Sequence, residues 1–268
     1  MGEKNSSFPT VLITGASGGI GEAFAHVAAG EGHPLILVAR TEAELHRVRG
    51  VVIARYAVPV SIIVLDLGKP GACDQLANEL EARKLEPDIL INNAGFGLIG
   101  KAAELQRETQ LQMIDLNVRA LSDLTLRFLP AMIAKGSGGV INVASTAGFM
   151  PGPNMAVYFA TKAYVMSFTE ALFEETKGSG VTLTTLSPGP VETGFQRRAG
   201  MKQARALSPM IPKTALAVAE AGWAGFKAGE RLVIPGTMNK LAAYALRGAP
   251  RRVILPVIRR AMGTAKAR

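Results

Sequence analysis

The chain has 268 residues, of which 48% are hydrophobic, so it can bury a substantial core as one compact domain. Its single cysteine, Cys73, excludes an intrachain disulfide and favours a reducing compartment. The three histidines have neither metal-ligand spacing nor a cysteine partner, so we expect no metal site, and the net charge of +9 arises entirely after Glu230.

The N-terminal segment "MGEKNSSFPT" is polar and leads directly into an apolar run. It lacks the hydrophobic region of a signal peptide, and no later apolar run reaches the roughly 18 residues needed to cross a bilayer. We therefore expect a soluble, cytoplasmic protein.

Seven short runs rich in Val, Ile, Leu and Thr alternate with longer stretches whose apolar residues have helical spacing. The short runs cover 10–15, 34–40, 61–67, 88–95, 139–145, 181–189 and 231–236. The helical stretches cover 20–30, 41–56, 70–84, 103–135, 158–177 and 214–228. This alternation is typical of an α/β fold with a parallel sheet covered on both faces. We predict one domain over 1–236, a Rossmann-like, doubly wound, seven-stranded parallel sheet, followed by a basic helical extension over 237–268.

The glycine-rich stretch "TGASGGIG" (14–21) follows the first predicted strand and precedes a helix. Glycines in such a turn allow a pyrophosphate to approach the backbone and the helix N-terminus, although a generic strand–helix turn has the same composition. We predict a dinucleotide site here, formed by Gly15, Ser17, Gly18, Gly19, Ile20 and Gly21.

The end of the second predicted strand indicates which dinucleotide binds. An acidic residue there would accept hydrogen bonds from an unphosphorylated ribose, but this chain has Ala39 and then Arg40. A guanidinium can bind a 2′-phosphate, and Ser17 and Thr41 can add hydroxyl donors, so the pattern favours NADP(H). The alternative is that Arg40 is a solvated surface residue. Asp66 and Leu67 end the third strand and can bracket the adenine, unless Asp66 only caps the next segment.

Tyr158 and Lys162 are four residues apart in "NMAVYFATKAY". If this segment is helical, the two side chains share one face about one turn apart. The spacing alone fits an ordinary surface pair as well as a phenol held beside an ammonium.

The motifs taken together resemble the short-chain dehydrogenase/reductase superfamily over roughly residues 9–236. The resemblance rests on "TGASGGIG", "NNAG" (92–95), Asn117 in "MIDLNVRA", Ser145 in "NVAST", the Tyr158–Lys162 pair and "SPGPVET" (187–193). Arg40 and the wording "NNAGFG" and "STAGFMPGP" are most similar to NADP-dependent reductases of ketones, including ketoacyl and steroid types.

The resemblance implies catalytic roles for four residues. Tyr158 would be the general acid that protonates a carbonyl oxygen, or the base in the reverse oxidation. Lys162 would lower the pKa of Tyr158 and hold the nicotinamide ribose, and Ser145 would donate a hydrogen bond to the carbonyl oxygen. Asn117 would hold a water that links Lys162 to solvent. Ser145 could instead be a strand-end cap, and Asn117 a buried asparagine bonded to backbone.

The resemblance also extends the cofactor site and suggests assembly. Asn93, Ala94 and Gly95 would line the cofactor or brace the sheet. The nicotinamide pocket would be shaped by Pro188, Gly189, Val191 and Thr193. A homodimer or homotetramer would form through helices 103–135 and 158–177.

The expected substrate walls are residues 148–157 and the Gly/Pro/Arg/Met-rich stretch 189–213. With Ser145, the apolar Phe149, Met155 and Phe195 favour a hydrophobic ketone or aldehyde, or a secondary alcohol, as the small-molecule substrate. These residues could also pack a lid or a dimer contact. Basic residues in 189–213 could attract an anionic acyl thioester, although a solvated loop fits equally.

Nine Lys or Arg and no acid follow Glu230, and eight of these nine cations lie in the C-terminal extension. It is predicted to form two short amphipathic helices interrupted around 248–250. We expect its apolar face to pack on the core or on a partner subunit. Peripheral membrane contact is the alternative, and nucleic-acid binding is not expected because Tyr244 is its only aromatic residue.

We therefore predict an NADP(H)-dependent oxidoreductase that acts on CH–OH donors or the matching carbonyls. The alternatives within the enzyme class are an NAD-dependent alcohol or hydroxysteroid dehydrogenase and a 3-oxoacyl thioester reductase. Two non-enzymatic alternatives are a catalytically inactive dinucleotide sensor and a membrane adaptor.

Overall fold

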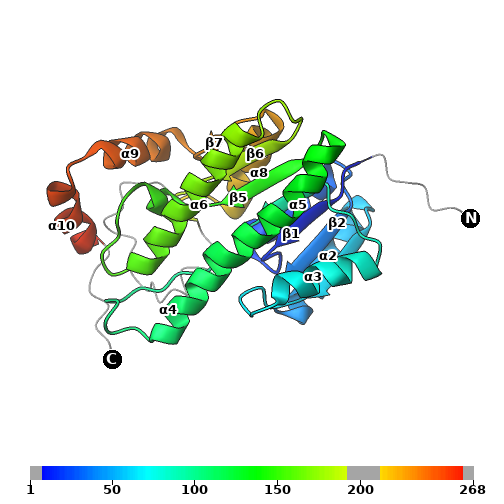
Figure 1. Cartoon of the computed structure of the whole chain (residues 1–268), viewed down its shortest axis with the longest axis horizontal. Coiled ribbons are helices and arrows are strands. Elements are labelled where there is room, and N and C mark those ends of the chain that lie inside the picture. The colour runs from blue at the N-terminus through cyan, green and yellow to red at the C-terminus, as the bar shows by residue number, and fades with distance from the viewer. Residues whose placement is uncertain (1–7, 192–211, 262–268) are drawn as a thin grey trace, which may run out of the picture.

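The fold is a seven-stranded parallel sheet with helices on both faces, as Figure 1 shows in a computed structural model that describes residues 8–191 and 212–261. The strand order is β3-β2-β1-β4-β5-β6-β7, and every neighbouring pair is parallel. The strands are β1 (Val11–Thr14), β2 (Leu35–Ala39), β3 (Val60–Val64), β4 (Ile89–Asn92), β5 (Gly139–Val143), β6 (Thr182–Leu186) and β7 (Leu232–Val233). The predicted doubly wound α/β architecture is confirmed.

Two sets of helices bury apolar faces against the two sides of the sheet. One side is covered by α1 (Gly19–Gly30), α2 (Glu42–Tyr56) and α8 (Ala215–Lys227). The other is covered by α3 (Ala72–Ala82), α5 (Leu121–Lys135) and α6 (Ala156–Glu175), which lie in front of the sheet in Figure 1. The central strands are apolar on both faces because each face has its own helix layer.

The predicted helical stretch 103–135 is helical without a break from Arg107 to Lys135, but it is not α-helical throughout. It comprises α4 (Arg107–Ile114), a π-helical segment (Asp115–Ala120) and α5. Asn117 lies in the π segment and its side chain bonds to the backbone of Phe96, outside the helix. A wider turn of this kind re-aims a side chain, which periodicity cannot reveal.

The order of strands places the functional edge of the sheet. The chain runs from β1 to β2 and β3 in one direction and from β4 to β7 in the other, so the switch lies between β1 and β4. In open α/β sheets, ligands bind outside the carboxyl ends of the strands at this point. The glycine-rich turn after β1 and "NNAG" after β4 meet there.

Two further helices follow β7, namely α9 (Thr237–Gly248) and α10 (Arg251–Ala261), which form one end of the molecule in Figure 1. Among the described residues, none of the helices is long and apolar enough to cross a membrane. The same residues contain no group of His, Cys, Asp or Glu arranged to hold a metal ion.

Candidate active site

The turn between β1 and α1 brings the backbone of two segments unusually close. Gly15 has a φ of +66°, and a Cβ there would lie 2.9 Å from both the Ala94 Cα and the Asn93 Nδ2. A Cβ on Gly21, in the first turn of α1, would lie 2.3 Å from the Gly15 carbonyl oxygen. Only glycine fits at these two positions, so the turn is a cradle of exposed backbone.

The N-terminus of α1 has no side-chain cap, because Gly18 occupies the N-cap position. Its first N–H groups are therefore available to an anionic ligand, which the helix dipole also favours. Gly19, Ile20 and Gly21 form the first turn, and Ser17 lies half-buried before it. The predicted glycine-turn residues are thus together, in an arrangement that fits the pyrophosphate of a dinucleotide.

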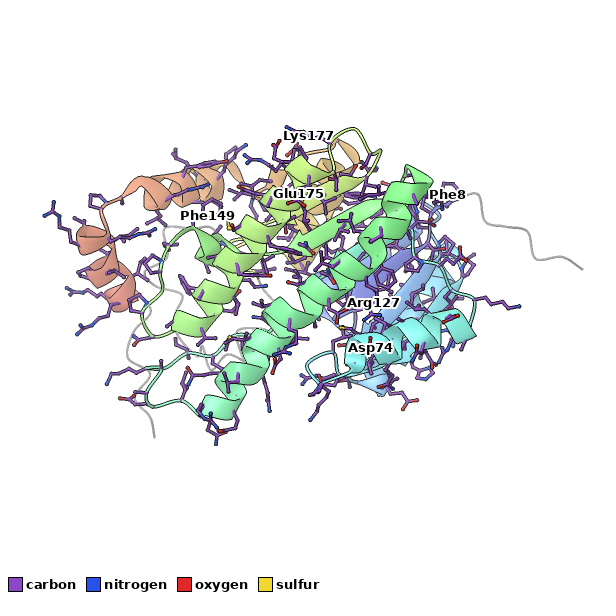
Figure 2. The ribbon with its side chains drawn as sticks, viewed as in Figure 1. Phe8, Asp74, Arg127, Phe149, Glu175 and Lys177 are labelled. Carbon is purple, nitrogen blue, oxygen red and sulfur yellow. The ribbon has the colours of Figure 1, made fainter. Side chains whose placement is uncertain are left out.

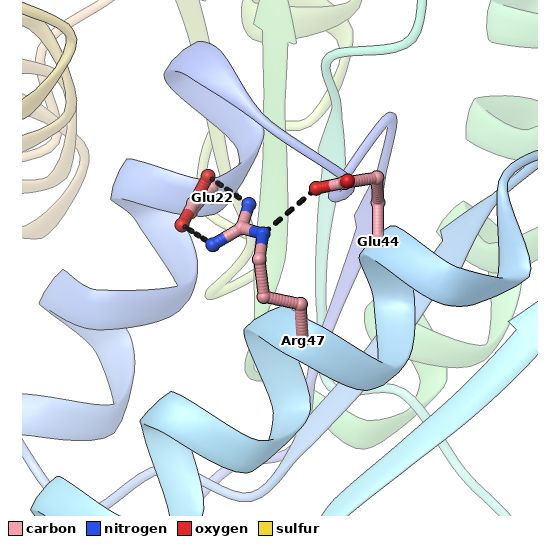
Figure 3. A network of polar contacts seen from close by, with 3 residues as sticks. All are labelled: Glu22, Glu44 and Arg47. Carbon is pink, nitrogen blue, oxygen red and sulfur yellow. Dashed lines mark hydrogen bonds and ion pairs between the residues drawn. The ribbon is translucent and has the colours of Figure 1, made fainter.

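A network of three charged residues holds α1 against α2 beside this turn. Arg47 donates to both carboxylate oxygens of Glu22, at 2.8 and 2.9 Å, and to Glu44 at 2.7 Å (Figure 3). The hydrogen bonds that Arg47 donates to Glu22 raise the pKa of Arg47 well above its usual range. Because Glu22 stands in the first turn of α1, its neutralisation by Arg47 keeps that helix end receptive to an anion.

The "NNAG" segment braces the glycine turn. The Asn93 side chain donates to the carbonyl oxygens of Thr14 and Gly15 at 2.9 and 3.2 Å. The Thr14 hydroxyl accepts from the backbone N–H groups of Asn93 and Ala94, both at 3.0 Å. Both β1 and β4 are thereby fixed at the switch point.

Arg40 and Asp66 follow β2 and β3 at the outer part of the same edge. The Arg40 Nη1 lies 3.8 Å from an Asp66 oxygen, and the Arg40 side chain is 58% exposed. Such a loose pair leaves the guanidinium free to turn toward a ligand. Thr41 is at the N-cap of α2 without a side-chain cap bond, while Leu67 is buried and the Asp66 carboxylate accepts from Gly68 N–H.

Asn117 is completely buried and bonds two neighbouring segments. Its Oδ1 accepts from Phe96 N–H at 3.1 Å, and its Nδ2 donates to Phe96 C=O at 2.9 Å and to Thr161 Oγ1 at 3.2 Å. Thr161 lies in α6, one residue before Lys162. Asn117 therefore ties the segment after "NNAG" to the helix that carries the Tyr–Lys pair.

Ser145 follows β5 and caps the 3₁₀ turn Thr146–Phe149. Its hydroxyl oxygen accepts from Ala147 N–H at 3.1 Å, and the hydroxyl lies 3.4 Å from the Pro188 carbonyl oxygen, to which it donates. Ser145 therefore has the capping role that we gave as the alternative to a catalytic one. The same hydroxyl is also hydrogen-bonded to Tyr158.

Tyr158 and Lys162 both lie buried on one face of α6, as the spacing predicts. The Lys162 Nζ donates to the Val143 carbonyl oxygen at 2.8 Å and lies 5.9 Å from the centre of the Tyr158 ring. The pair thus joins Ser145 at the carboxyl end of β5. The four residues predicted to act together, Asn117 included, line one corner of the switch-point edge.

The two titratable groups are shifted in opposite directions by burial. Burial raises the pKa of the Tyr158 phenol to about 12, although the hydrogen bond with Ser145 lowers it. Burial lowers the pKa of the Lys162 ammonium to about 8. The neutral forms are favoured because little water reaches either group. Such perturbed groups at a sheet edge are typical of functional sites.

The segment after β6 closes the edge beside Ser145. Thr146 N–H donates to the Pro188 carbonyl oxygen at 2.9 Å, and Val191 is buried and pairs with Lys213. Gly189 lies against the side chain of Asn239, at the start of α9. Thr193 and Phe195 lie outside the described residues, as do all the basic and Met residues expected between 192 and 211.

Tyr158 belongs to an apolar cluster. Met155 and Tyr158 pack there with Met113, Ala147 and Phe159, and Phe96, Leu98, Ile99, Met150 and Val157 are packed against them. A small cavity of about 10 Å³ between α4 and the start of α6 is lined partly by Leu98, Met113 and Tyr158. Our sequence reasoning missed Leu98 and Met113, although Met113 stands one helical turn before Asn117 and Leu98 follows "NNAG" closely.

Phe149 lies elsewhere. It belongs to a separate cluster with Val165 and Met166, and its ring meets that of Tyr244 edge to face at 6.1 Å. Figure 2 shows Phe149 between α6 and the C-terminal helices. It joins the turn after Ser145 to α9, whereas Met155 lies beside Tyr158.

Known proteins of one family are similar to this chain both in sequence and in structure. The profile of the family described as short chain dehydrogenase matches residues 9–204. A sulfoacetaldehyde reductase of Chromohalobacter salexigens is 38% identical over 187 residues, which are 69% of this chain and 73% of that protein. A very-long-chain 3-oxoacyl-CoA reductase of Anas platyrhynchos is 31% identical over 192 residues, covering 69% of this chain and 61% of the other.

A solved structure extends the similarity to the C-terminal helices. A short-chain dehydrogenase from Sphingobium yanoikuyae in complex with NADPH aligns with a TM-score of 0.81 at 32% identity. The alignment covers 97% of this chain and 100% of the other.

Proposed function

This chain belongs to the short-chain dehydrogenase family, and from that membership we propose that it is an NADP(H)-dependent reductase of apolar ketones or aldehydes that also runs the reverse oxidation. It is an oxidoreductase of alcohol or carbonyl substrates with a nicotinamide cofactor. One observation carries the proposal: a buried phenol, Tyr158, hydrogen-bonded to Ser145 and one helical turn from the buried Lys162.

The proposed mechanism assigns each of these groups a step. When bound, the nicotinamide supplies or accepts the hydride. Tyr158 gives its phenolic proton to the carbonyl oxygen, and Ser145 donates a hydrogen bond to the same oxygen while negative charge develops there. In the oxidation the phenolate removes that proton from the alcohol. Lys162 holds the cofactor ribose and, when protonated, favours the phenolate.

Asn117 takes a supporting role in this scheme. Both N–H donors of its side-chain amide and one lone pair of its Oδ1 are used in bonds to Phe96 and Thr161. We therefore assign it the positioning of Phe96 and of α6, while a relay water would contact the backbone opened by the π turn.

The preference for NADP(H) over NAD(H) is supported by Arg40. This residue stands where an acid would accept the ribose hydroxyls of NAD(H), and its guanidinium is loosely held and largely exposed. Thr41 follows Arg40 directly in the sequence, and Ser17 lies at the same edge of the sheet. Neither hydroxyl forms a helix-capping hydrogen bond. The structural relative from Sphingobium was solved with NADPH, which agrees with this proposal.

The substrate class follows from the apolar cluster beside Tyr158. Met113 and Met155 are buried beside Tyr158 and Leu98 is half-buried there, so the surroundings of the phenol on this side are apolar and adaptable. An apolar ketone fits this surface better than a polar sugar. A 3-oxoacyl thioester is the second candidate, because one relative is a 3-oxoacyl-CoA reductase and an acyl chain would use the same surface.

We also propose that the protein forms a homodimer or homotetramer through α4, α5 and α6. Exposed apolar side chains gather on these helices, namely Leu111, Ile114, Leu126, Ile133 and Tyr164. A wide groove between α5 and α6 is lined by Val118, Ser122, Leu126 and Tyr164, among others. Apolar surface of this kind is usually covered in an assembly.

A screen of NADPH consumption tests the function. Purified protein is given NADPH with aliphatic and aromatic ketones, aldehydes and 3-oxoacyl thioesters, alongside Tyr158→Phe and a no-substrate control. We expect turnover with apolar ketones or aldehydes and none with the variant. The opposite result is tight NADPH binding with no turnover of any carbonyl, and no turnover of any alcohol with NADP⁺. It would favour a catalytically inactive dinucleotide sensor over an enzyme.

A further inference from the structure

The two C-terminal helices carry several exposed cations. Lys240 and Arg247 in α9, and Arg251, Arg252, Arg259 and Arg260 in α10, are all exposed. Across residues 8–191 and 212–261 no acidic group forms an ion pair with any of the six. The sequence has no acid after Glu230, so the charge of this end is not neutralised from within. In Figure 2, nitrogen-tipped side chains project outward from α10.

Large apolar side chains are exposed between these cations. On α9, Met238, Leu241 and Tyr244 are 54, 66 and 45% exposed, and on α10 Val253 and Val257 are 58 and 59% exposed. Leu241 is among the most exposed large apolar residues of the described chain. If this face were only a solvated charged surface, large apolar side chains would not be expected to be exposed on it.

The opposite faces of both helices are already in use. Asn239 and Ala243 of α9 are buried, while the partly exposed Tyr244 also meets the Phe149 ring edge to face. Ile254 and Ile258 of α10 are buried as well. The predicted packing on the core therefore covers only part of the apolar surface of α9 and α10. Because that part is held against the core, the remaining apolar side chains face outward.

We propose that the outward face of α9 and α10 is a docking surface for an anionic lipid bilayer. Helices with apolar side chains flanked by Lys and Arg lie in the interface of such bilayers, with the apolar groups among the acyl chains and the cations at the headgroups. The uncompensated positive charge matches an anionic surface. A nucleic acid would match the charge but not the aliphatic side chains, since single strands are held by stacking on aromatic residues.

Sedimentation with sucrose-loaded vesicles tests the proposal. The full-length protein is mixed with vesicles of phosphatidylcholine alone or with about one third phosphatidylglycerol, at low and high salt, because surface charge is screened beyond about 10 Å at 0.1 M salt. We expect binding only to the anionic vesicles, weakened by salt. Truncation is avoided because α9 contacts the turn after Ser145.

Two double variants separate the charge from the apolar contribution. Arg252→Glu with Arg259→Glu removes two cations and adds two anions, so we expect the partition coefficient to fall by at least about thirtyfold. Leu241→Ser with Val257→Ser keeps the charge, and we expect a fall of about tenfold or more.

Matched controls alter exposed residues on other helices, α2 and α8. Arg49→Glu with Arg55→Glu makes the same change in charge on α2, and Val51→Ser with Leu216→Ser makes the same apolar change. Both controls should bind anionic vesicles nearly as the parent does. Circular dichroism and NADPH turnover in solution should be unchanged in all four variants.

Three results would overturn the proposal. The first is no binding to anionic vesicles by a folded, active protein. The second is salt-sensitive binding to duplex or single-stranded oligonucleotides that exceeds vesicle binding and survives Leu241→Ser with Val257→Ser. The third is a smaller particle mass in light scattering for that apolar variant without lipid, which would make a second copy the occupant of the surface.

Discussion

The side chain of Asn117 pairs with both polar backbone groups of Phe96, accepting from its N–H at 3.1 Å and donating to its C=O at 2.9 Å. Phe96 directly follows "NNAG", so the pair fastens the switch-point loop to the π turn. We predict that Asn117→Leu lowers the free energy of unfolding by about 2–4 kcal/mol, because two backbone groups lose their partner. Urea unfolding measures this.

The control for that substitution is Thr161→Val, which removes the third bond of Asn117 and the bond from the Thr161 hydroxyl to the Tyr158 carbonyl oxygen, and leaves the Phe96 pair intact. Its expected cost is about 1 kcal/mol. Equal losses in the two variants would show that the Phe96 pair is not the dominant contact.

Tyr158→Phe removes the proton donor and keeps the ring in its apolar cluster. We expect turnover to fall by about 100- to 10,000-fold, the usual range for a lost general acid. NADPH affinity, followed by fluorescence of the reduced nicotinamide, should change little. Ser145→Ala should lower turnover less, because it removes a hydrogen bond to the carbonyl oxygen and leaves the proton donor Tyr158 in place. Substantial activity in Tyr158→Phe would remove the phenol from the acid role.

The opposite pKa shifts of Lys162 and Tyr158 predict how stability depends on pH without cofactor. Lys162 has a folded-state pKa of about 8 against an ordinary 10.5, so between these values the unfolded chain holds a proton that the folded chain has lost. Raising the pH through this window therefore increases stability. Tyr158 has a pKa of about 12 against 10.0, so above pH 10 the folded chain keeps a proton that the unfolded chain loses, and stability falls.

Comparison with Lys162→Met isolates the first effect from other titrating groups. Between about pH 8 and 10 the parent should gain about 2 kcal/mol relative to this variant in urea unfolding. Above pH 10 the parent should lose stability relative to Tyr158→Phe. A parent curve parallel to that of Lys162→Met would mean that the Lys162 ammonium is well solvated in the folded protein.

Arg40→Asp tests the choice of dinucleotide. A carboxylate at this position would repel a 2′-phosphate and accept hydrogen bonds from the ribose hydroxyls of NADH. We expect the ratio of NADPH to NADH affinity to fall by about tenfold or more, measured by direct titration. Arg49→Asp, on the exposed face of α2, is the matched control, and an unchanged ratio in Arg40→Asp would assign discrimination to other residues.

Gly21→Ala tests the backbone cradle. The new Cβ would lie 2.3 Å from the Gly15 carbonyl oxygen, so the turn must open and dinucleotide binding should be lost. Gly50→Ala is the control within α2, where a Cβ meets no atom within 4 Å. It should stabilise the protein by about 0.5–1 kcal/mol. Normal NADPH affinity in Gly21→Ala would contradict the cradle.

The sequence predicted the sheet, because β1, β2, β4 and β5 are buried on both faces and their segments therefore consist mostly of apolar residues. Helical spacing predicted that Tyr158 and Lys162 share one face of a helix, and the resemblance to the family implied that Ser145 joins them. The sequence did not reveal the π turn at Asn117, whose side chain bonds to Phe96 in a different segment of the chain. Nor did it separate Phe149 from Met155, since two neighbours in one loop can face different clusters.

Strand β7 is only two residues long and pairs with β6 alone. The Val233 carbonyl oxygen in β7 accepts a hydrogen bond from Ser187 N–H at 2.8 Å. The next residue is Pro188, whose carbonyl oxygen accepts a hydrogen bond from the Ser145 hydroxyl. The orientation of Ser145 thus depends on the weakest edge of the sheet. Heating should therefore open this edge and inactivate the protein before the remaining six strands unfold, so that the half-life of activity and the midpoint of unfolding report different events.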